Sequence, residues 1–253
     1  MSEFFIELFS EEIPANLQNK TRQDFFQNLK EFFEKEDIKY SGEATAFSIP
    51  NRLIVYFQNI SKKITKKENE IRGPNINAPE DALNGFLKSY KISIDITYKK
   101  KTDKGEFYFF KKPSESIETK FVLQKNLPKI LDKISWKKSM RWADHELYWG
   151  RPLKSILCCF DNKTLEFEYH HLVSSNITFI DKDFEQKTKK FVRFKDYLAF
   201  FKSQNIILDN KKREQFIVDQ LNRIAKKENL KIHFNSTLSV SYTHLTLPTS
   251  LIV

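Results

Sequence analysis

Strand-like and helix-like hydrophobic patterns are mixed along this chain in an irregular order, and this mixture constrains its fold more than any other feature. Residues 3–9 (EFFIELF) form a short apolar run that suits a buried strand. A stripe with the i, i+4, i+7, i+8 spacing of an amphipathic helix is formed by Phe25, Leu29, Phe32 and Phe33. Because strands and helices do not follow a regular βαβ alternation, the sequence predicts an α+β fold with mainly antiparallel hairpins and no doubly wound sheet.

Turn residues locate the hairpins. Three are predicted: 43–49 with 52–60 around Pro50-Asn51, 92–99 with 106–112 around Asp103-Lys104-Gly105, and 153–160 with 164–169 around Asp161-Asn162-Lys163. Glycine suits the second turn because it adopts positive φ without strain. In the third hairpin Leu165, Phe167 and Tyr169 alternate with glutamates, so one face of that strand is expected to be dry.

Four more helices are predicted, at 79–90, 117–134, 194–203 and 211–227. Pro128 is expected to kink the helix over 117–134 or to start a second one there, because proline lacks a backbone N–H. In the last helix Ile217, Leu221 and Ile224 are expected to face inward.

The net charge of +10 and the pI near 9.3 fit RNA binding without establishing it. Eight of the 43 basic residues are arginine and the rest are lysine, and Phe, Ile and Asn are abundant. This is the amino-acid bias of an AT-rich genome, which raises the pI whatever the partner. Charge alone therefore leaves RNA contact and compositional bias equally open.

The sequence supplies no catalytic, cofactor-binding or metal-binding pattern. Five glycines, none at motif spacing, cannot form a glycine-rich phosphate loop. His145, His170, His171 and His233 lack the spacing of zinc ligands, so they are interpreted as structural or surface residues, with His170 and His171 diverging. Cys158 and Cys159 lie in an apolar strand and are interpreted as buried, reduced thiols on opposite faces.

Six short segments spanning residues 4–152 resemble, in order, segments of the β subunit of bacterial two-subunit glycyl-tRNA synthetase. They are FFIELFSEEIPA at 4–15, IPNRL at 49–53, RGP at 72–74 with Gly85-Phe86, TDKGE at 102–106, KSMRW at 138–142 and WGRP at 149–152. Phe9 stands where that family usually has glycine, and residues 176–184 lack the glycine and histidine of its Arg-Gly-His-Arg-Phe segment. The likeness returns at 205–230, with a short strand and a basic helix.

The resemblance implies the function. The family's enzyme is a cytoplasmic tetramer of two α and two β subunits, a glycine–tRNA ligase that attaches glycine to its tRNA. ATP, with Mg, is used through the α subunit, which forms glycyl-adenylate, so no cofactor and no adenylation site are expected on this chain. The β subunit supplies tRNA recognition and assembly. The implied partners are the α subunit, tRNA(Gly) and a second β subunit, with no membrane and no DNA. The alternative function is a freestanding basic RNA-binding or assembly module without a ligase partner.

The resemblance also suggests a domain organisation. Residues 1–181 correspond to an N-terminal α+β region and residues 182–239 to the start of a following helical or mixed segment, cut short. Residues 240–253 (VSYTHLTLPTSLIV) resemble the translation of a sequencing adapter and are interpreted as a non-native tail.

The candidate contact residues for tRNA or a subunit interface are all basic or aromatic, and each has a structural alternative. Arg141 with Trp142, and Arg151, suit base stacking and backbone contact, or a buried tryptophan with an internal ion pair. Arg72 suits a phosphate, or a loop carbonyl. The remaining candidates are Arg52, Lys211 and Arg213, the last two on a helical face that suits phosphate or plain solvent.

Overall fold

The computed structural model describes residues 2–66, 69–102, 105–182 and 185–232. The chain divides into two compact units, which are considered separately: a main unit of residues 1–62 and 119–253, and an inserted unit of residues 63–118. The sequence patterns do not predict this insertion. A boundary after residue 181 falls within the main unit and stays a prediction, and the segment 240–253 lies outside the described residues.

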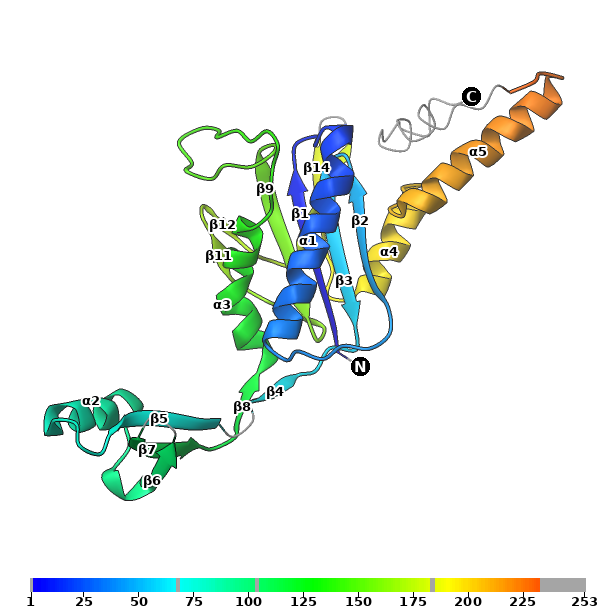
Figure 1. Cartoon of the computed structure of the whole chain (residues 1–253). Helices are drawn as coiled ribbons and strands as arrows, with labels where there is room; N and C mark the ends of the chain where they lie inside the picture. Colours follow the sequence, from blue (N-terminus) through cyan, green and yellow to red (C-terminus); the bar gives the residue numbers. More distant parts are fainter. Residues whose placement is uncertain (1, 67–68, 103–104, 183–184, 233–253) are drawn as a thin grey trace. The chain divides into compact units, whose positions relative to one another are not determined.

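A five-stranded antiparallel sheet organises the main unit, in the order β10-β9-β1-β3-β2 (Figure 1). Its strands are β1 (Glu3–Ser10), β2 (Ala44–Ile49), β3 (Arg52–Gln58), β9 (Leu153–Phe160) and β10 (Lys163–Thr164). The central strand β1 pairs with β3 on one side and with β9 on the other, so it has no free edge. This strand is the predicted apolar run.

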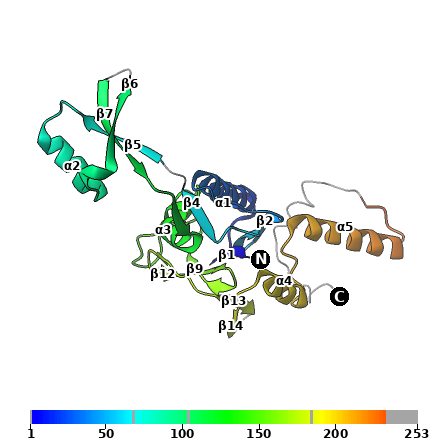
Figure 2. The same ribbon diagram turned by 90° about the horizontal axis from the view of Figure 1, so that it is seen from below.

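Both faces of the sheet are covered, which explains why β1 is apolar at consecutive positions. On one face lie α1 (Ala15–Lys35) and α3 (Thr119–Asp132), where Phe33 of α1 packs against Phe4 and Phe57. On the other face lie β13 (Ile177–Lys182), β14 (Glu185–Lys190) and α4 (Phe194–Ser203). Figure 2 shows α1 on one side of the sheet strands and α4 with β14 on the other.

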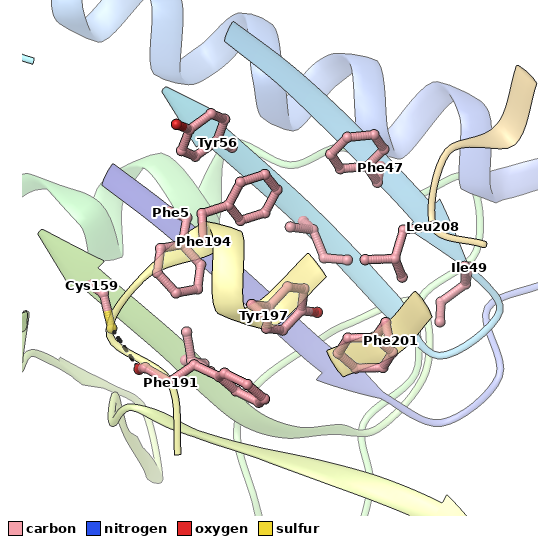
Figure 3. Close-up of a cluster of buried hydrophobic side chains, with 12 residues drawn as sticks. Phe5, Phe47, Ile49, Tyr56, Cys159, Phe191, Phe194, Tyr197, Phe201 and Leu208 are labelled. Atoms are coloured by element: carbon pink, nitrogen blue, oxygen red, sulfur yellow. Dashed lines mark hydrogen bonds between the residues drawn. The ribbon is translucent and has the colours of Figure 1, made fainter. Parts of the chain in front are cut away.

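The core under α4 is mainly aromatic (Figure 3). Phe194 stacks on Tyr56 with ring centroids 4.0 Å apart, and Tyr197 and Phe201 of α4 are buried beside it. Cys159 points into this core and its thiol donates to the carbonyl of Phe191 at 3.3 Å. Burial raises the pKa of Cys159 to about 12, and both cysteines are free thiols, which confirms the prediction of buried, unreactive side chains.

A charged network interrupts this core. The carboxylate of Glu7, in the middle of β1, has no exposed surface. The Nε atom of Arg52 lies 3.2 Å from Glu7 Oε2, and neither side chain is more than 4% exposed. The hydroxyls of Thr178 and Tyr197 both donate hydrogen bonds to the same carboxylate. Burial, and then the negative charge of Glu7, raise the pKa of Tyr197, so its phenol keeps the proton that it donates. This Glu7 network joins β1, β3, β13 and α4.

The hairpins predicted from turn residues have mixed outcomes. The β2–β3 hairpin forms around Pro50-Asn51 as predicted. The partner of β9 is much shorter than predicted: β10 ends at Thr164, and the chain turns away to form β11 (Glu168–Tyr169) and β12 (Leu172–Val173). The hydroxyl oxygen of Ser174 stabilises this change of direction by accepting a hydrogen bond from the N–H of Phe167 at 2.8 Å. The expected alternation survives, since Leu165, Phe167 and Tyr169 are buried.

The helical predictions at the end of the described chain need two corrections. The predicted short strand before the last helix is absent from the described residues 204–209, which lead directly into α5 (Asn210–Lys227). Asp209 caps α5 by accepting from the N–H groups of Lys211 and Lys212. Two of the three residues predicted to face inward on α5 are exposed, Leu221 at 47% and Ile224 at 48%, whereas Ile217 is half-buried.

Elsewhere the helices agree with the sequence patterns. α3 is a single helix that contains Pro128, rather than two helices. In the described part of the chain, no helix combines the length and the apolar character that a membrane crossing requires.

The inserted unit contains two small sheets. β4 (Lys63–Lys66) pairs with β8 (Glu115–Glu118) where the chain enters and leaves the unit. A three-stranded sheet follows, in the order β5-β7-β6, from β5 (Asn69–Asn75), β6 (Thr97–Thr102) and β7 (Gly105–Lys112). The helix α2 (Glu80–Tyr90) and a 3-10 turn, η1 (Ile94–Ile96), connect β5 to β6. The β6–β7 hairpin confirms the prediction, with Gly105 at φ +115, although η1 replaces the first residues of the predicted strand.

Replacing Arg52 by Met should destabilise the main unit strongly. The change leaves the Glu7 carboxylate buried with only hydroxyl donors, and breaking one side of a buried ion pair costs about 3–5 kcal/mol. Urea denaturation of both proteins, followed by circular dichroism, measures the loss in the free energy of unfolding.

The matched control is Lys62→Met, which breaks an exposed pair with Asp161 whose Nζ–Oδ2 distance is 2.6 Å. Lys62 is 61% exposed, so this variant should lose about 0–1 kcal/mol. Equal losses in the free energy of unfolding of the two variants would show that the buried ion pair stabilises the protein no more than the exposed pair does.

Candidate functional site

The loop between α3 and β9 carries the segments that most specifically resemble the known family. Met140 and Trp149 form a two-way backbone bridge, with N···O distances of 2.8 and 3.1 Å. Trp149 is buried, and its ring centroid lies 5.1 Å from that of Trp136. A Cβ atom at Gly150 would lie 2.1 Å from Trp136 Cε3, so a side chain at this position would displace the indole. These contacts fix the backbone directly before Arg151.

Trp142, in the same loop, forms an aromatic cluster with two histidines. The rings of His145 and His171 are stacked, with centroids 3.6 Å apart and planes 3° apart. Trp142 packs edge-on against both, at 6.2 Å from His145 and 5.7 Å from His171. His145 comes from the loop and His171 from the turn between β11 and β12, so the stack joins two segments.

A cleft of about 300 Å³ opens beside this cluster. Aromatic and apolar side chains make up most of its wall, and Lys154 adds a positive charge. We call it the Trp–His cleft; it is lined by Phe9, Trp142, Leu153, Lys154, His171, Leu172 and Phe179. Lys154 Nζ lies 2.7 Å from Glu11 Oε1 and 5.7 Å from the centroid of Phe9. The site therefore offers flat rings and the Lys154–Glu11 ion pair to a ligand.

The buried Glu7 network supports one wall of the cleft. Phe9 and Phe179 stack with centroids 5.7 Å apart and planes 15° apart. Behind them, the Arg52 guanidinium carbon lies 4.5 Å from the Phe9 centroid, and Arg52 Nη2 donates to the carbonyl of Phe179. Arg52 Nη1 donates to Asn51 Oδ1 at 2.7 Å. Arg52 thus positions both aromatic rings from inside the protein.

The histidine stack affects proton binding. Desolvation lowers the pKa of His171 below its ordinary value of 6.5, and the nearby His145 and then His170 lower it further. A backbone hydrogen bond at Leu153 acts in the opposite direction. The imidazole of His171 is therefore neutral near pH 7 and can stack without like-charge repulsion.

The structure brings three of the predicted contact residues into one loop. Arg141 is exposed and Trp142 is half-buried at the cleft. Arg151 is half-buried and donates to the carbonyl of Gly150 at 2.9 Å. Their contact with tRNA stays a prediction.

The other four predicted residues are dispersed. Arg52 is 3% exposed and Arg213 7% exposed, so each is held inside the chain. Arg213 Nη1 donates to the carbonyl of Ile207 at 2.6 Å, and burial lowers its pKa to about 10. Lys211 is exposed at the start of α5, and Arg72 is exposed in the inserted unit.

Sequence reasoning misses three features of the site: the Glu7 network, Lys154 and the histidine stack. Glu7 has a signal, since it is a charge with apolar residues on both sides in a strand. His145 and His171 have none, because they are separated along the chain and fit no ligand spacing. His170 and His171 diverge as predicted, with the ring of His170 against Tyr169 at 4.8 Å. No group of three or more His, Cys, Asp or Glu suited to a metal occurs among the described residues.

The fold and the site define an α+β protein with a mainly aromatic cleft that is supported by a buried ion pair. Comparison with known families is more specific. The family model described as "Glycyl-tRNA synthetase beta subunit" matches residues 4–252, and the chain belongs to this family. The match includes residues 240–252, whose interpretation as a foreign tail stays a prediction.

Several curated relatives are similar over nearly the whole chain, and each is named "Glycine--tRNA ligase beta subunit". The protein of Rickettsia prowazekii (strain Madrid E) is 36% identical over 233 residues, which are 92% of this chain and 35% of the relative. That of Rickettsia felis (strain ATCC VR-1525 / URRWXCal2) is 36% identical over 240 residues, 94% of this chain and 36% of the relative. That of Rickettsia typhi (strain ATCC VR-144 / Wilmington) is 35% identical over 245 residues, which are 97% of this chain and 37% of the relative. The chain thus spans little more than a third of these relatives' length.

Histidine titration should confirm the stack in solution. We expect the pKa of His171, measured from its imidazole carbon-bound proton by NMR, to lie below 6.5. Since this pKa is lowered in the folded state, the associated stability is present above the unfolded value and is lost as the pH falls through the folded one.

Two variants separate the causes. His145→Phe keeps an aromatic ring and removes the titrating neighbour, so the pKa of His171 should rise while staying below 6.5, because desolvation is the larger cause. His170→Gln should raise the pKa of His171 less than His145→Phe does, because His170 is the smaller of the two electrostatic causes. A His171 pKa at or above 6.5 in the parent chain would contradict the stacked geometry.

Proposed function

We propose that this chain acts as part of the β subunit of a tetrameric glycyl-tRNA synthetase. In this proposal it supports the ATP-dependent glycylation of tRNA(Gly) through tRNA recognition and through assembly with an α subunit and a second β subunit. The observation that carries the proposal is the family match over residues 4–252. The relatives' names, which describe a β subunit of a glycine–tRNA ligase, support it.

In the proposed division of work, the α subunit uses ATP and Mg to form glycyl-adenylate in the cytoplasm. The chemistry of the Trp–His cleft fits the supporting role of this chain. Its lining includes the rings of Trp142, His171 and Phe179, which suit base stacking, and Lys154, which suits phosphate contact. Arg141 and Arg151 lie on the same loop as Trp142 and add two positive charges to that loop.

The exposed side of α5 supports the assembly part of the proposal. Phe216, Leu221 and Ile224 are between 45% and 48% exposed, on a helix whose first turn is anchored by Arg213. Large apolar side chains at this exposure are typical of a surface that another protein segment covers.

Adenylate formation should require the α subunit. The purified chain, incubated with glycine, ATP and labelled pyrophosphate, is expected to give no pyrophosphate exchange. Addition of a purified glycyl-tRNA synthetase α subunit should give exchange, and the chain should retain that subunit on an affinity column.

Exchange by the chain alone would overturn the assignment of adenylation to the α subunit. A chain that binds RNA but does not retain the α subunit would favour the alternative of a freestanding RNA-binding module. A sample of the chain that is denatured and refolded before it is loaded on the column serves as the control. It shows whether exposed apolar surface alone retains the α subunit.

A further inference from the structure

The three-stranded sheet of the inserted unit has two unlike faces. The helix α2 packs on one of them. A Cβ atom at Gly73 would lie 2.9 Å from Phe86 Cε1, and the rings of Tyr90 and Phe110 are 6.0 Å apart. Among the described residues of this unit α2 is the single α-helix, so no described α-helix of the unit covers the opposite face.

Strand register places aromatic and basic residues together on that opposite face. Phe109 of β7 lies directly across from Arg72 of β5 and Tyr98 of β6, so the three side chains share one face. Phe107, two residues before Phe109, shares it too, and Lys100 lies across from Phe107. We call this surface the open sheet face; it consists of Arg72, Tyr98, Lys100, Phe107, Phe109 and Lys111.

Cations lie over the rings of this face. The Arg72 guanidinium carbon is 4.4 Å from the centroid of Phe107, and Lys100 Nζ is 5.4 Å from that of Phe109. The rings of Tyr98 and Phe109 are stacked at 6.2 Å with planes 27° apart. Arg72 is exposed, and Phe107 and Tyr98 are half-buried. Phe109 is 7% exposed, so the face presents the half-buried rings of Phe107 and Tyr98 together with positive side chains.

The charge balance of the face favours an anionic ligand. One acidic residue, Glu70, shares these rungs of the sheet, across from Lys111. Its carboxylate already accepts from the Tyr98 hydroxyl and from Lys100 Nζ, both at 2.6 Å. Glu70 therefore neutralises one cation of three, and the face keeps a net positive charge.

We propose that the open sheet face binds unpaired nucleotides of RNA, whose bases stack on Phe107, Tyr98 and the Arg72 guanidinium while phosphates meet Arg72 and Lys111. Unpaired bases expose π faces that side chains can stack upon, whereas bases inside a duplex do not. The proposal rests on the proposed function, in which tRNA is the RNA partner, and assigns the contact with its unpaired segments to this surface.

Direct binding tests the proposal on the full chain. The probe is a fluorescein-labelled oligouridine of about ten nucleotides, a length within the usual site size for such surfaces. Fluorescence anisotropy gives its Kd at several salt concentrations. A blunt-ended RNA duplex without a loop, of equal charge, gives the comparison for unpaired bases.

Matched variants on the two faces separate a site from bulk charge. Arg72→Gln with Lys111→Gln removes two cations from the open sheet face, and Lys99→Gln with Lys101→Gln removes two from the face where α2 packs. The first pair should weaken binding on the order of tenfold and flatten the slope of log Kd against log salt by about 0.7 for each phosphate that the variant no longer neutralises. The second pair should bind nearly as the parent does.

A second comparison does not depend on charge. Phe107→Leu removes a ring from the open sheet face and should weaken binding of the oligouridine on the order of tenfold. Tyr108→Leu removes a ring from the other face and should leave the Kd within about twofold. Circular dichroism confirms that each variant keeps the parent's secondary structure.

The inference is overturned if the parent chain does not bind oligouridine, if it prefers the duplex, or if the paired variants on the two faces lose affinity equally. Retention of the α subunit by the same proteins is measured in parallel. A parent chain that retains the α subunit but does not bind oligouridine rejects the open sheet face alone, whereas failure to retain the α subunit rejects the proposed function.

Discussion

A buried carboxylate in the central strand is the constraint on which the main unit depends. Glu7 lies between Ile6 and Leu8, in a strand covered on both faces, and it has no access to water. Leaving such a charge unpaired costs several kcal/mol, so the fold must bring donors to it. They come from three elements that are distant in sequence: Arg52, Thr178 and Tyr197. The same carboxylate therefore sets the position of β13 and α4 on the sheet.

The Trp–His cleft is built on this arrangement. Phe9 is two residues beyond Glu7 on the same face of β1, and Phe179 follows Thr178 in β13. Arg52 contacts both, since its guanidinium lies over the ring of Phe9 and donates to the carbonyl of Phe179. The Glu7–Arg52 ion pair thus stabilises both the interior of the fold and one wall of the Trp–His cleft. The segment 176–184, which departs from the family pattern, still provides Thr178 and Phe179 to this assembly.

The sequence predicts local elements well and long-range partners poorly. The strand over residues 3–9 and the β2–β3 hairpin are set by short-range patterns, and both are confirmed. The inserted unit escapes prediction because β4 and β8 are lysine- and glutamate-rich strands that are far apart in sequence, and nothing local shows that they pair. Arg52 is proposed from its motif as a contact residue, yet it is buried, because the pairing of β1 with β3 places it near Glu7.

The central claim is that Glu7 and the helix α4 are energetically coupled through the Tyr197 hydrogen bond. A double-mutant cycle with Glu7→Gln and Tyr197→Phe, measured by urea denaturation, tests it most directly. The account predicts that the double variant loses less stability than the sum of the single variants, with a coupling energy of about 1–3 kcal/mol. Additive losses, within about 0.5 kcal/mol, would contradict the claim that this carboxylate holds α4 on the sheet.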